Sequence, residues 1–247
     1  MPGVFISRGM TLTIPDGGLI LSIDPEGKTD SSLTLHVHFD VCPTWCQLAL
    51  QHLEKARQAR EERVAAWSAN NEELKGKTLE REFEASMQAI MAAAVALEAF
   101  YAVVQQSVQL PPSLVDRWRN GRTARYSQIT EVLRRAFKLK PKGVAVLRQN
   151  LREIYKFRDL AIHPSGKIEA PVHHPELDVG VEWRFAYFRA TNAEGIVMAA
   201  TAIVCDLAVN GKPADKKVQN YMKNLRDRLV EMFPDGHPNV KAKEQAP

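Results

Sequence analysis

The chain has 247 residues, 45% of them hydrophobic and 25% charged, a composition typical of a globular protein with one large domain or one domain and an appendage. No apolar run approaches the ~18 residues of a transmembrane span, and no basic segment followed by an apolar one stands at the N-terminus, so we expect neither a membrane span nor a secretory signal. Three cysteines argue against a disulfide framework and favour a reducing, cytoplasmic compartment.

The basic residues are concentrated in one part of the chain. Between Arg117 and Arg158, thirteen Lys or Arg residues are opposed only by Glu131 and Glu153, which gives this segment a net charge of +11. Because the whole chain carries +4, the remainder carries −7. Such segregation is typical of a surface that faces nucleic acid, although a basic face that only keeps the protein soluble has the same composition.

Residues 1–43 are predicted to form a β extension. Two strand-like runs, 11–14 and 19–23, flank the turn signal at 15–18, and apolar and polar residues alternate over 33–41. Three strands are too few for a sheet with two buried faces. We therefore expect this segment to pack on the rest of the chain or to pair with a partner.

Residues 44–232 are predicted to form a helical bundle. The apolar spacing indicates helices over about 45–75, 78–108, 124–139, 142–163, 192–208 and 213–232. Segment 167–188 is expected to be an irregular excursion with an exposed His173-His174 pair and a hairpin near 176–188. Residues 233–247 are expected to be a flexible tail. The predicted class is mainly α, a helical bundle with a small β extension.

Helix 142–163 carries the most informative motif, Arg158-Asp159-Leu160-Ala161-Ile162-His163. Its apolar stripe, formed by Leu147, Leu151, Ile154 and Ile162, includes Arg158. A charge on such a stripe is costly unless it is paired. Glu98, which flanks the apolar stripe of helix 78–108, is the predicted partner of Arg158.

A second stripe of the same helix is polar and mostly basic, and consists of Arg148, Arg152, Lys156, Asp159 and His163. The first three are candidate RNA contacts. Asp159 and His163 lie one turn apart, and the helix C-terminus favours a positive charge, so both effects favour the protonated imidazole. A C-capping histidine with no chemical role would occupy the same position.

Arg158 and His163 do not converge on a straight helix. At about 100° per residue, they lie roughly 140° apart around the axis. Either the last turn is distorted, or the Arg158 side chain wraps round the helix, or a second copy of the chain supplies the missing group. Phe157 and Leu160 lie outside the stripe of Leu147 and Ile154, as expected of a helix that contacts both its own core and a partner.

The motif resembles the signature of HEPN domains, in which an arginine, a polar residue, three further residues and a histidine follow one another. The resemblance covers about residues 78–208, and Leu97-Glu98-Ala99-Phe100-Tyr101 on the preceding helix also resembles such bundles. HEPN proteins are helical bundles that commonly dimerise with two motifs facing each other. Their catalytic members are metal-independent ribonucleases of toxin–antitoxin, antiviral-defence and RNA-processing systems, and other members only bind.

The resemblance implies a role for each motif residue. His163 would transfer protons as the 2′-hydroxyl attacks and the 5′-oxygen leaves, Arg158 would stabilise charge on the phosphorane, and Asp159 would orient His163, with Glu98 supporting the arginine. No metal or cofactor is implied. The expected partners are RNA, a second copy of the chain and an antitoxin or other regulatory protein. No association with a membrane is expected. The alternative is a non-catalytic dimeric module that binds RNA or protein.

Two other residue sets could carry a function. His36, His38, Cys42 and Cys46 do not show the tight paired spacing of a zinc site, so a solvated strand face and two cytosolic thiols are the favoured interpretation. Trp67, Trp118 and Trp183 are either packing residues or platforms for base stacking. The sequence contains no phosphate-binding glycine loop, dinucleotide fingerprint or Gly-x-Ser-x-Gly elbow.

Overall fold

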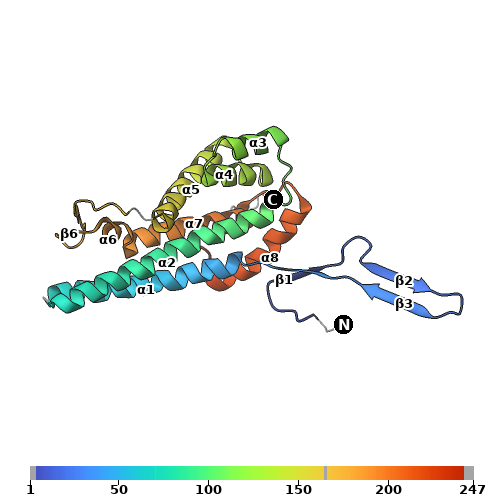
Figure 1. The fold of residues 1–247 in the computed structure, drawn as a ribbon, viewed down its shortest axis with the longest axis horizontal. Helices are drawn as coiled ribbons and strands as arrows, with labels where there is room; N and C mark the ends of the chain where they lie inside the picture. Colours follow the sequence, from blue (N-terminus) through green and yellow to red (C-terminus); the bar gives the residue numbers. More distant parts are fainter. Residues whose placement is uncertain (1–3, 70, 164–165, 242–247) are drawn as a thin grey trace. The chain divides into compact units, whose positions relative to one another are not determined.

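The computed structural model describes residues 4–69, 71–163 and 166–241, and the chain divides into two compact units between Val41 and Cys42. The second unit is built mainly of α-helices, as Figure 1 shows. The predicted class, mainly α with a small N-terminal β segment, is confirmed at this level.

The first unit consists of two nested antiparallel strand pairs. Strand β1 (Met10–Thr13) pairs with β4 (His36–Phe39), and β2 (Leu19–Ile23) pairs with β3 (Thr29–Leu33). Strand β3 was not predicted because its residues are mostly polar. Val37 is 45% exposed and Phe39 41% exposed, so the predicted strand 33–41 is not half-buried within this unit.

The second unit starts with a pair of long antiparallel helices, α1 (Cys42–Ser68) and α2 (Glu72–Gln105) (Figure 1). The prediction of one helix over 45–75 and a second from 78 is wrong at this boundary. The side chain of Asn71 accepts a hydrogen bond from the Leu74 N–H at 3.1 Å, and Glu72 and Glu73 follow in the first turn, where the helix dipole favours negative charge. These three residues start α2 six positions earlier than the apolar stripe alone indicates.

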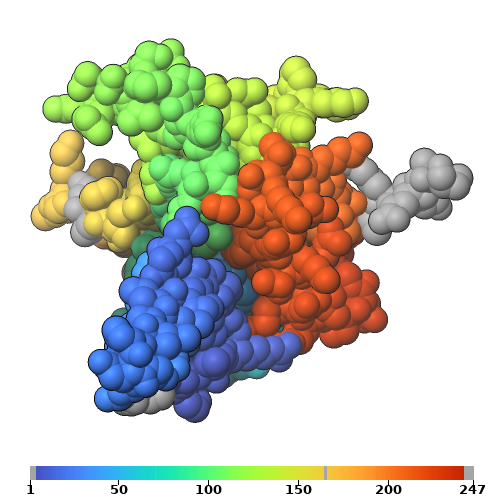
Figure 2. Space-filling model, turned by 90° about the vertical axis from the view of Figure 1, so that its right-hand side faces the viewer, coloured from blue at the N-terminus to red at the C-terminus, as the bar shows by residue number. Residues whose placement is uncertain are grey.

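Three shorter helices, α3 (Pro112–Asn120), α4 (Arg125–Ala136) and α5 (Pro141–Ile162), lie together on one side of the helical unit (Figures 1 and 2). Helix α3 was not predicted. Both α3 and α5 begin at a proline, whose fixed φ and missing N–H suit the first helical position. Helices α4 and α5 bury one face each in the common core, where Ile129, Leu133, Leu151 and Ile154 are fully buried.

The core is completed by α7 (Ala190–Asn210) and α8 (Lys216–Met232). Helices α2 and α7 are long and apolar enough to cross a membrane by length and composition, and 56% of the apolar window of each is buried inside the structure. This burial is what the core helices of a soluble protein show. The expectation that no apolar run approaches ~18 residues is therefore wrong for these two helices.

The segment between α5 and α7 differs from its prediction. Strands β5 (Val172–His173) and β6 (Gly180–Val181) pair, but the alternating residues beyond them form helix α6 (Trp183–Tyr187) rather than a strand. The Glu182 carboxylate caps this helix by accepting a hydrogen bond from the Arg184 N–H at 2.8 Å. Alternation over so few residues cannot distinguish a strand from a capped helical turn.

Residues 233–241 of the predicted tail lie against α7. His237 is 5% exposed, its Nε2 atom lies 2.9 Å from Thr201 Oγ1, and its ring packs on Phe233. A flexible tail is therefore not observed for this part, and residues 242–247 lie outside the described residues.

Candidate functional site

The motif occupies the last turn of α5, where the helix leaves the core. Leu147, Leu151 and Ile154 of its apolar stripe are buried, whereas Ile162 is 37% exposed. The Arg158 side chain is 30% exposed and that of Asp159 56% exposed, and Arg158 Nη1 donates to Asp159 Oδ1 at 3.1 Å. The stripe thus ends in a surface ion pair between neighbours.

Glu98 does not pair with Arg158, and that prediction is wrong. Arg125, the first residue of α4, takes this place: its Nε and Nη2 atoms donate to Glu98 Oε2 at 2.9 and 2.6 Å. The Tyr155 hydroxyl donates to Glu98 Oε1 at 2.7 Å. The apolar stripe of α5 predicts Arg158 as the cation and gives no signal for Arg125 or Tyr155, although Arg125 lies within the +11 segment.

Tyr155 links this half-buried carboxylate to the motif. The Arg158 guanidinium carbon lies 5.4 Å from the centroid of the Tyr155 ring, a cation–π distance. Burial and the negative charge of Glu98 raise the pKa of Tyr155, so its hydroxyl remains a donor. Burial alone would raise the pKa of Glu98, but the hydrogen bonds from Arg125 and Tyr155 outweigh it and hold that pKa below its ordinary value. Glu98 therefore positions Arg158 indirectly, through Tyr155.

His163 lies at the exposed C-cap of α5. Its backbone N–H donates to the Asp159 carbonyl at 3.0 Å, which closes the last turn. Within the described residues, no hydrogen bond or ion pair joins the Asp159 and His163 side chains, because the Asp159 carboxylate pairs with Arg158 instead. One chain thus brings Arg158 and Asp159 together and leaves His163 apart. The flanking positions 164–165 lie outside the described residues.

The apolar residues outside the main stripe of α5 are covered within the chain. The Phe157 ring packs against Tyr187 and Phe188, with centroids 6.2 Å away in both cases, and Leu160 packs against the core. Helix α6 and the residue after it therefore account for an apolar flank that the sequence analysis attributed to a partner. A homodimer remains a prediction, but Phe157 no longer supports it, because this side chain packs within its own chain.

The basic stripe of α5 faces solvent, since Arg148, Arg152, Lys156, Asp159 and His163 are all exposed. Part of the charge of the +11 segment is neutralised locally: Glu131 pairs with Arg134 and Arg135, whose hydrogen bonds lower its pKa to about 2. Eight cations of the segment are exposed and have no carboxylate within 4.0 Å in the described part of the chain: Arg117, Arg119, Arg122, Lys138, Lys140, Lys142, Arg148 and Arg152. We call these eight residues the free basic set.

Two hollows lie along this stripe. The first, of about 420 Å³, is lined by Arg125, Tyr126, Arg152, Tyr155, Lys156 and Asp159, and we call it the α4–α5 pocket. The second, of about 560 Å³, is lined in part by Arg117, Trp118, Arg135 and Arg148, and we call it the α3–α4 pocket. Arg148 and Lys156 are eight residues apart on α5, about 12 Å along its axis. The basic stripe therefore connects two cationic pockets. Asp159 lines the α4–α5 pocket and also belongs to the motif.

The described residues contain no cluster of three His, Cys, Asp or Glu side chains able to hold a metal ion. Cys42 and Cys46 are fully buried on α1, whereas His36 and His38 are exposed on β4.

The prediction that His173 and His174 are both exposed is wrong for His174, whose side chain is fully buried.

Comparison with protein-family models, with curated proteins and with solved structures finds no match to this chain.

Proposed function

We propose that the protein is a metal-independent endoribonuclease of the HEPN type, which binds RNA along α5 and cleaves it at the Arg158–His163 motif. The single observation that carries the proposal is the α4–α5 pocket, which Arg125, Arg152 and Lys156 line together with Asp159 of the motif. Cationic side chains and an exposed histidine on the same helix are what binding and cleavage of a phosphodiester require.

RNA binding rests on the exposed charge. Phosphate contacts supply most of the affinity of proteins for nucleic acids, and the free basic set offers guanidinium and ammonium groups that no carboxylate neutralises. Trp118, which lines the α3–α4 pocket, offers an aromatic face on which a base can stack. A single strand lying along α5 would pass both pockets before it reaches the motif.

Cleavage assigns each group one task. The 2′-oxygen attacks the adjacent phosphorus as its proton is removed, the bond to the 5′-oxygen breaks, and that oxygen takes up a proton. The products are a 2′,3′-cyclic phosphate and a 5′-hydroxyl. His163 transfers the protons, Arg158 stabilises charge on the phosphorane, and Asp159 holds Arg158 or, in a dimer, releases it to orient the histidine.

A second subunit completes the site in this proposal. Arg158 and His163 point to different sides of α5, so two motifs related by a two-fold axis bring the arginine of one chain near the histidine of the other. The same activity fits a role in a toxin–antitoxin or antiviral-defence system with a regulatory partner.

A non-catalytic RNA- or protein-binding module is the second candidate. It is favoured by the pairing of Arg158 with Asp159 in the same chain and by the cover that α6 gives to Phe157. Both candidates predict RNA binding that weakens with salt. Only the first predicts cyclic-phosphate ends without divalent metal.

Cleavage of labelled RNA in EDTA, with analysis of the 3′ ends, distinguishes the two. We expect wild type to leave 2′,3′-cyclic phosphates and His163→Ala to be slower by ~10²-fold or more, as for the loss of a general acid–base. His163→Ala should not alter the thermal unfolding of the protein, since His163 is exposed.

His173→Ala is the matched control, because His173 is an exposed histidine ten residues further along the chain. It should cleave like wild type. Equal cleavage by wild type and His163→Ala, or 3′-phosphate ends that appear only with added Mg²⁺, would contradict the catalytic assignment. The non-catalytic binding module would then be the remaining candidate.

A further inference from the structure

A buried histidine, His174, lies beside an ionic network away from the motif, and its Nδ1 atom accepts a hydrogen bond from the backbone N–H of one member, Glu176. The network joins α1, α2, the β5–β6 turn and the start of α7. Glu82 accepts hydrogen bonds from the Arg63 side chain and from the Ala190 N–H. Glu176 accepts hydrogen bonds from the side chains of Arg60, Arg63, Arg189 and Thr191. Arg63 and His174 are fully buried and Glu82 is 1% exposed.

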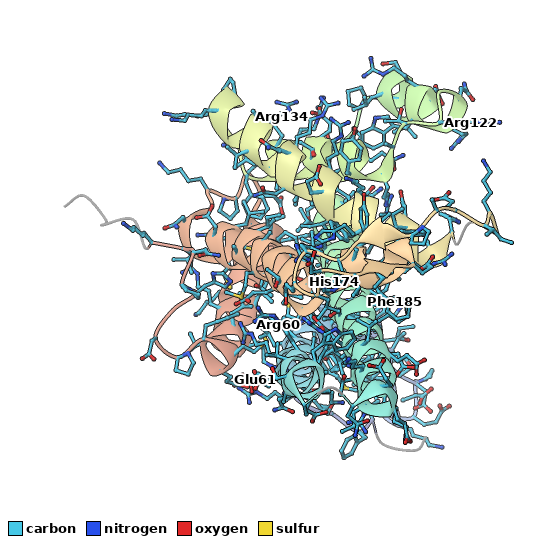
Figure 3. All side chains as sticks on the ribbon, turned by 90° about the vertical axis from the view of Figure 1, so that its left-hand side faces the viewer. Arg60, Glu61, Arg122, Arg134, His174 and Phe185 are labelled. Carbon is cyan, nitrogen blue, oxygen red and sulfur yellow. The ribbon has the colours of Figure 1, made fainter. Side chains whose placement is uncertain are left out.

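This network fixes residues 172–189, which comprise β5, β6 and α6 and which we call the strap. Glu176 of the strap accepts from Arg60 Nε at 2.9 Å and from Arg63 Nη2 at 2.7 Å, both on α1. Figure 3 shows Arg60, His174 and Phe185 in the same part of the helical unit. The ionic contacts thus anchor the strap at its first half.

The second half of the strap covers aromatic residues of the bundle. Phe185 packs on Phe83 of α2 with ring centroids 5.4 Å apart, and Phe188 packs on both Phe83 and Phe157. Phe157 directly precedes Arg158. Release of the strap would therefore expose the apolar flank of the helix that carries the motif.

The hydrogen bonds of His174 define its protonation state. Its Nδ1 atom accepts from the Glu176 N–H at 3.1 Å, so the ring is neutral and its proton is on Nε2. That Nε2 atom and Arg63 Nη1 are buried and have no hydrogen-bond partner among the described residues. A second proton on Nδ1 would place two donors against each other and add a buried charge.

We propose that His174 is an acid-sensitive lock: its neutral ring holds the strap on α1 and α2, and its protonation releases the strap and uncovers Phe83 and Phe157. The inference does not depend on the proposed function, since it concerns only the attachment of the strap.

The charged groups around His174 support this direction. Burial and the positive charge of Arg63 lower its pKa from the ordinary value of 6.5, Arg189 acts in the same sense, and Glu82 and Glu176 oppose them without reversing the shift. Because the attached state has the lower pKa, the released state binds more protons below 6.5. Attachment is therefore strongest above that pH and is lost as the pH falls below it.

Hydrogen exchange of the full chain, measured by mass spectrometry from pH 7.5 to 5.5 and corrected for intrinsic rates, tests the lock. We expect the protection of residues 172–189 to fall by up to about tenfold per pH unit below 6.5, while α8 keeps its protection. His174→Gln, whose amide can accept from the Glu176 N–H and does not titrate, should abolish this pH dependence.

His237→Gln is the matched control. His237 is also buried, its Nδ1 atom accepts from the Asn239 N–H at 3.1 Å in the same local arrangement, and burial lowers its pKa too. Among the described residues its side chain contacts Thr201, Asn239 and Phe233, none of which belongs to the strap. This variant should keep the pH dependence of the strap. The lock is refuted if wild-type protection stays constant to pH 5.5, or if the pH dependence disappears in His237→Gln.

A third measurement decides the matter if His174→Gln does not fold. Wild type and His237→Gln should then both lose protection in the strap before α8 does as the pH falls. Simultaneous loss in the strap and in α8 would mean general acid unfolding and would overturn the inference.

Discussion

Two groups of arginines in the helical unit occupy opposite environments. Arg63 is fully buried between α1 and α2 and binds two glutamates, whereas Arg117, Arg122 and Arg152 are exposed and have no carboxylate partner in the described part of the chain. Figure 3 shows Arg122 and Arg134 well apart from Arg60 and His174. The first group holds the fold together, and the second is available to a ligand.

The difference shows that local charge alone does not identify a binding surface. What separates the groups is their position relative to the apolar period of their own helix. Arg63 continues the buried stripe of Leu53, Ala56 and Ala59, so it must find a partner inside. Arg148 and Arg152 each follow a buried leucine by one position and lie on the polar face.

The largest expected effect comes from breaking the buried group. Arg63→Ala leaves Glu82 buried without its cation, and such a change costs about 3–5 kcal/mol of unfolding free energy. Chemical denaturation of the purified variant measures this loss.

Arg81→Ala is the control, because Arg81 and Glu62 join the same two helices over the same sequence separation of 19 residues, but with side chains 63% and 53% exposed. An exposed pair contributes at most about 1 kcal/mol. Equal losses in both variants would show that burial does not distinguish the two ion pairs.

Most of the helical unit could be predicted from its sequence, because long helices with continuous apolar faces leave a strong period. The boundary at Asn71 and helix α3 were missed, since each depends on a cap or a proline rather than on the period. The fold of residues 172–189 was missed for a different reason. Its shape depends on Arg63 and Glu82, which lie about one hundred residues earlier in the chain.

The candidate site was only partly predictable. The exposed basic stripe follows from helical geometry, which requires only the spacing of Arg148, Arg152 and Lys156. The partners of Glu98 could not be predicted from helical geometry, because they lie on other helices. Helix α2 supplies the carboxylate, α4 supplies Arg125 and α5 supplies Tyr155. The apolar period of a single helix does not show which residues of other helices contact it.

An intermediate effect is expected at Glu98, where the two environments meet. Glu98→Ala leaves Arg125 without its carboxylate and the partly buried Tyr155 hydroxyl without its acceptor, which should cost about 1–3 kcal/mol in chemical denaturation. Glu131→Ala is the control, since Glu131 binds Arg134 and Arg135 only within α4, and such local pairs contribute about 0.3–0.5 kcal/mol each. A smaller loss for Glu98→Ala than for Glu131→Ala would contradict the linking role of Glu98.

The smallest effect concerns the exposed group and leaves stability unchanged. If Arg152 and Lys156 contact phosphates of single-stranded RNA, each change to alanine should reduce the slope of log K against log salt concentration by about 0.7, because one fewer counterion is released. Binding titrations of wild type and the two variants over a range of salt concentrations measure these slopes.

Arg60→Ala removes the same charge from an exposed arginine that already has a carboxylate partner, Glu176, and it should leave the slope unchanged. The comparison of slopes is more informative than a comparison of affinities, since an unspecific loss of net charge would lower the affinity of all three variants alike. A slope that falls equally in Arg60→Ala would mean that RNA responds to the total charge of the molecule. A slope that falls only in Arg152→Ala and Lys156→Ala would place the phosphates in the α4–α5 pocket, beside the carboxylate of Asp159.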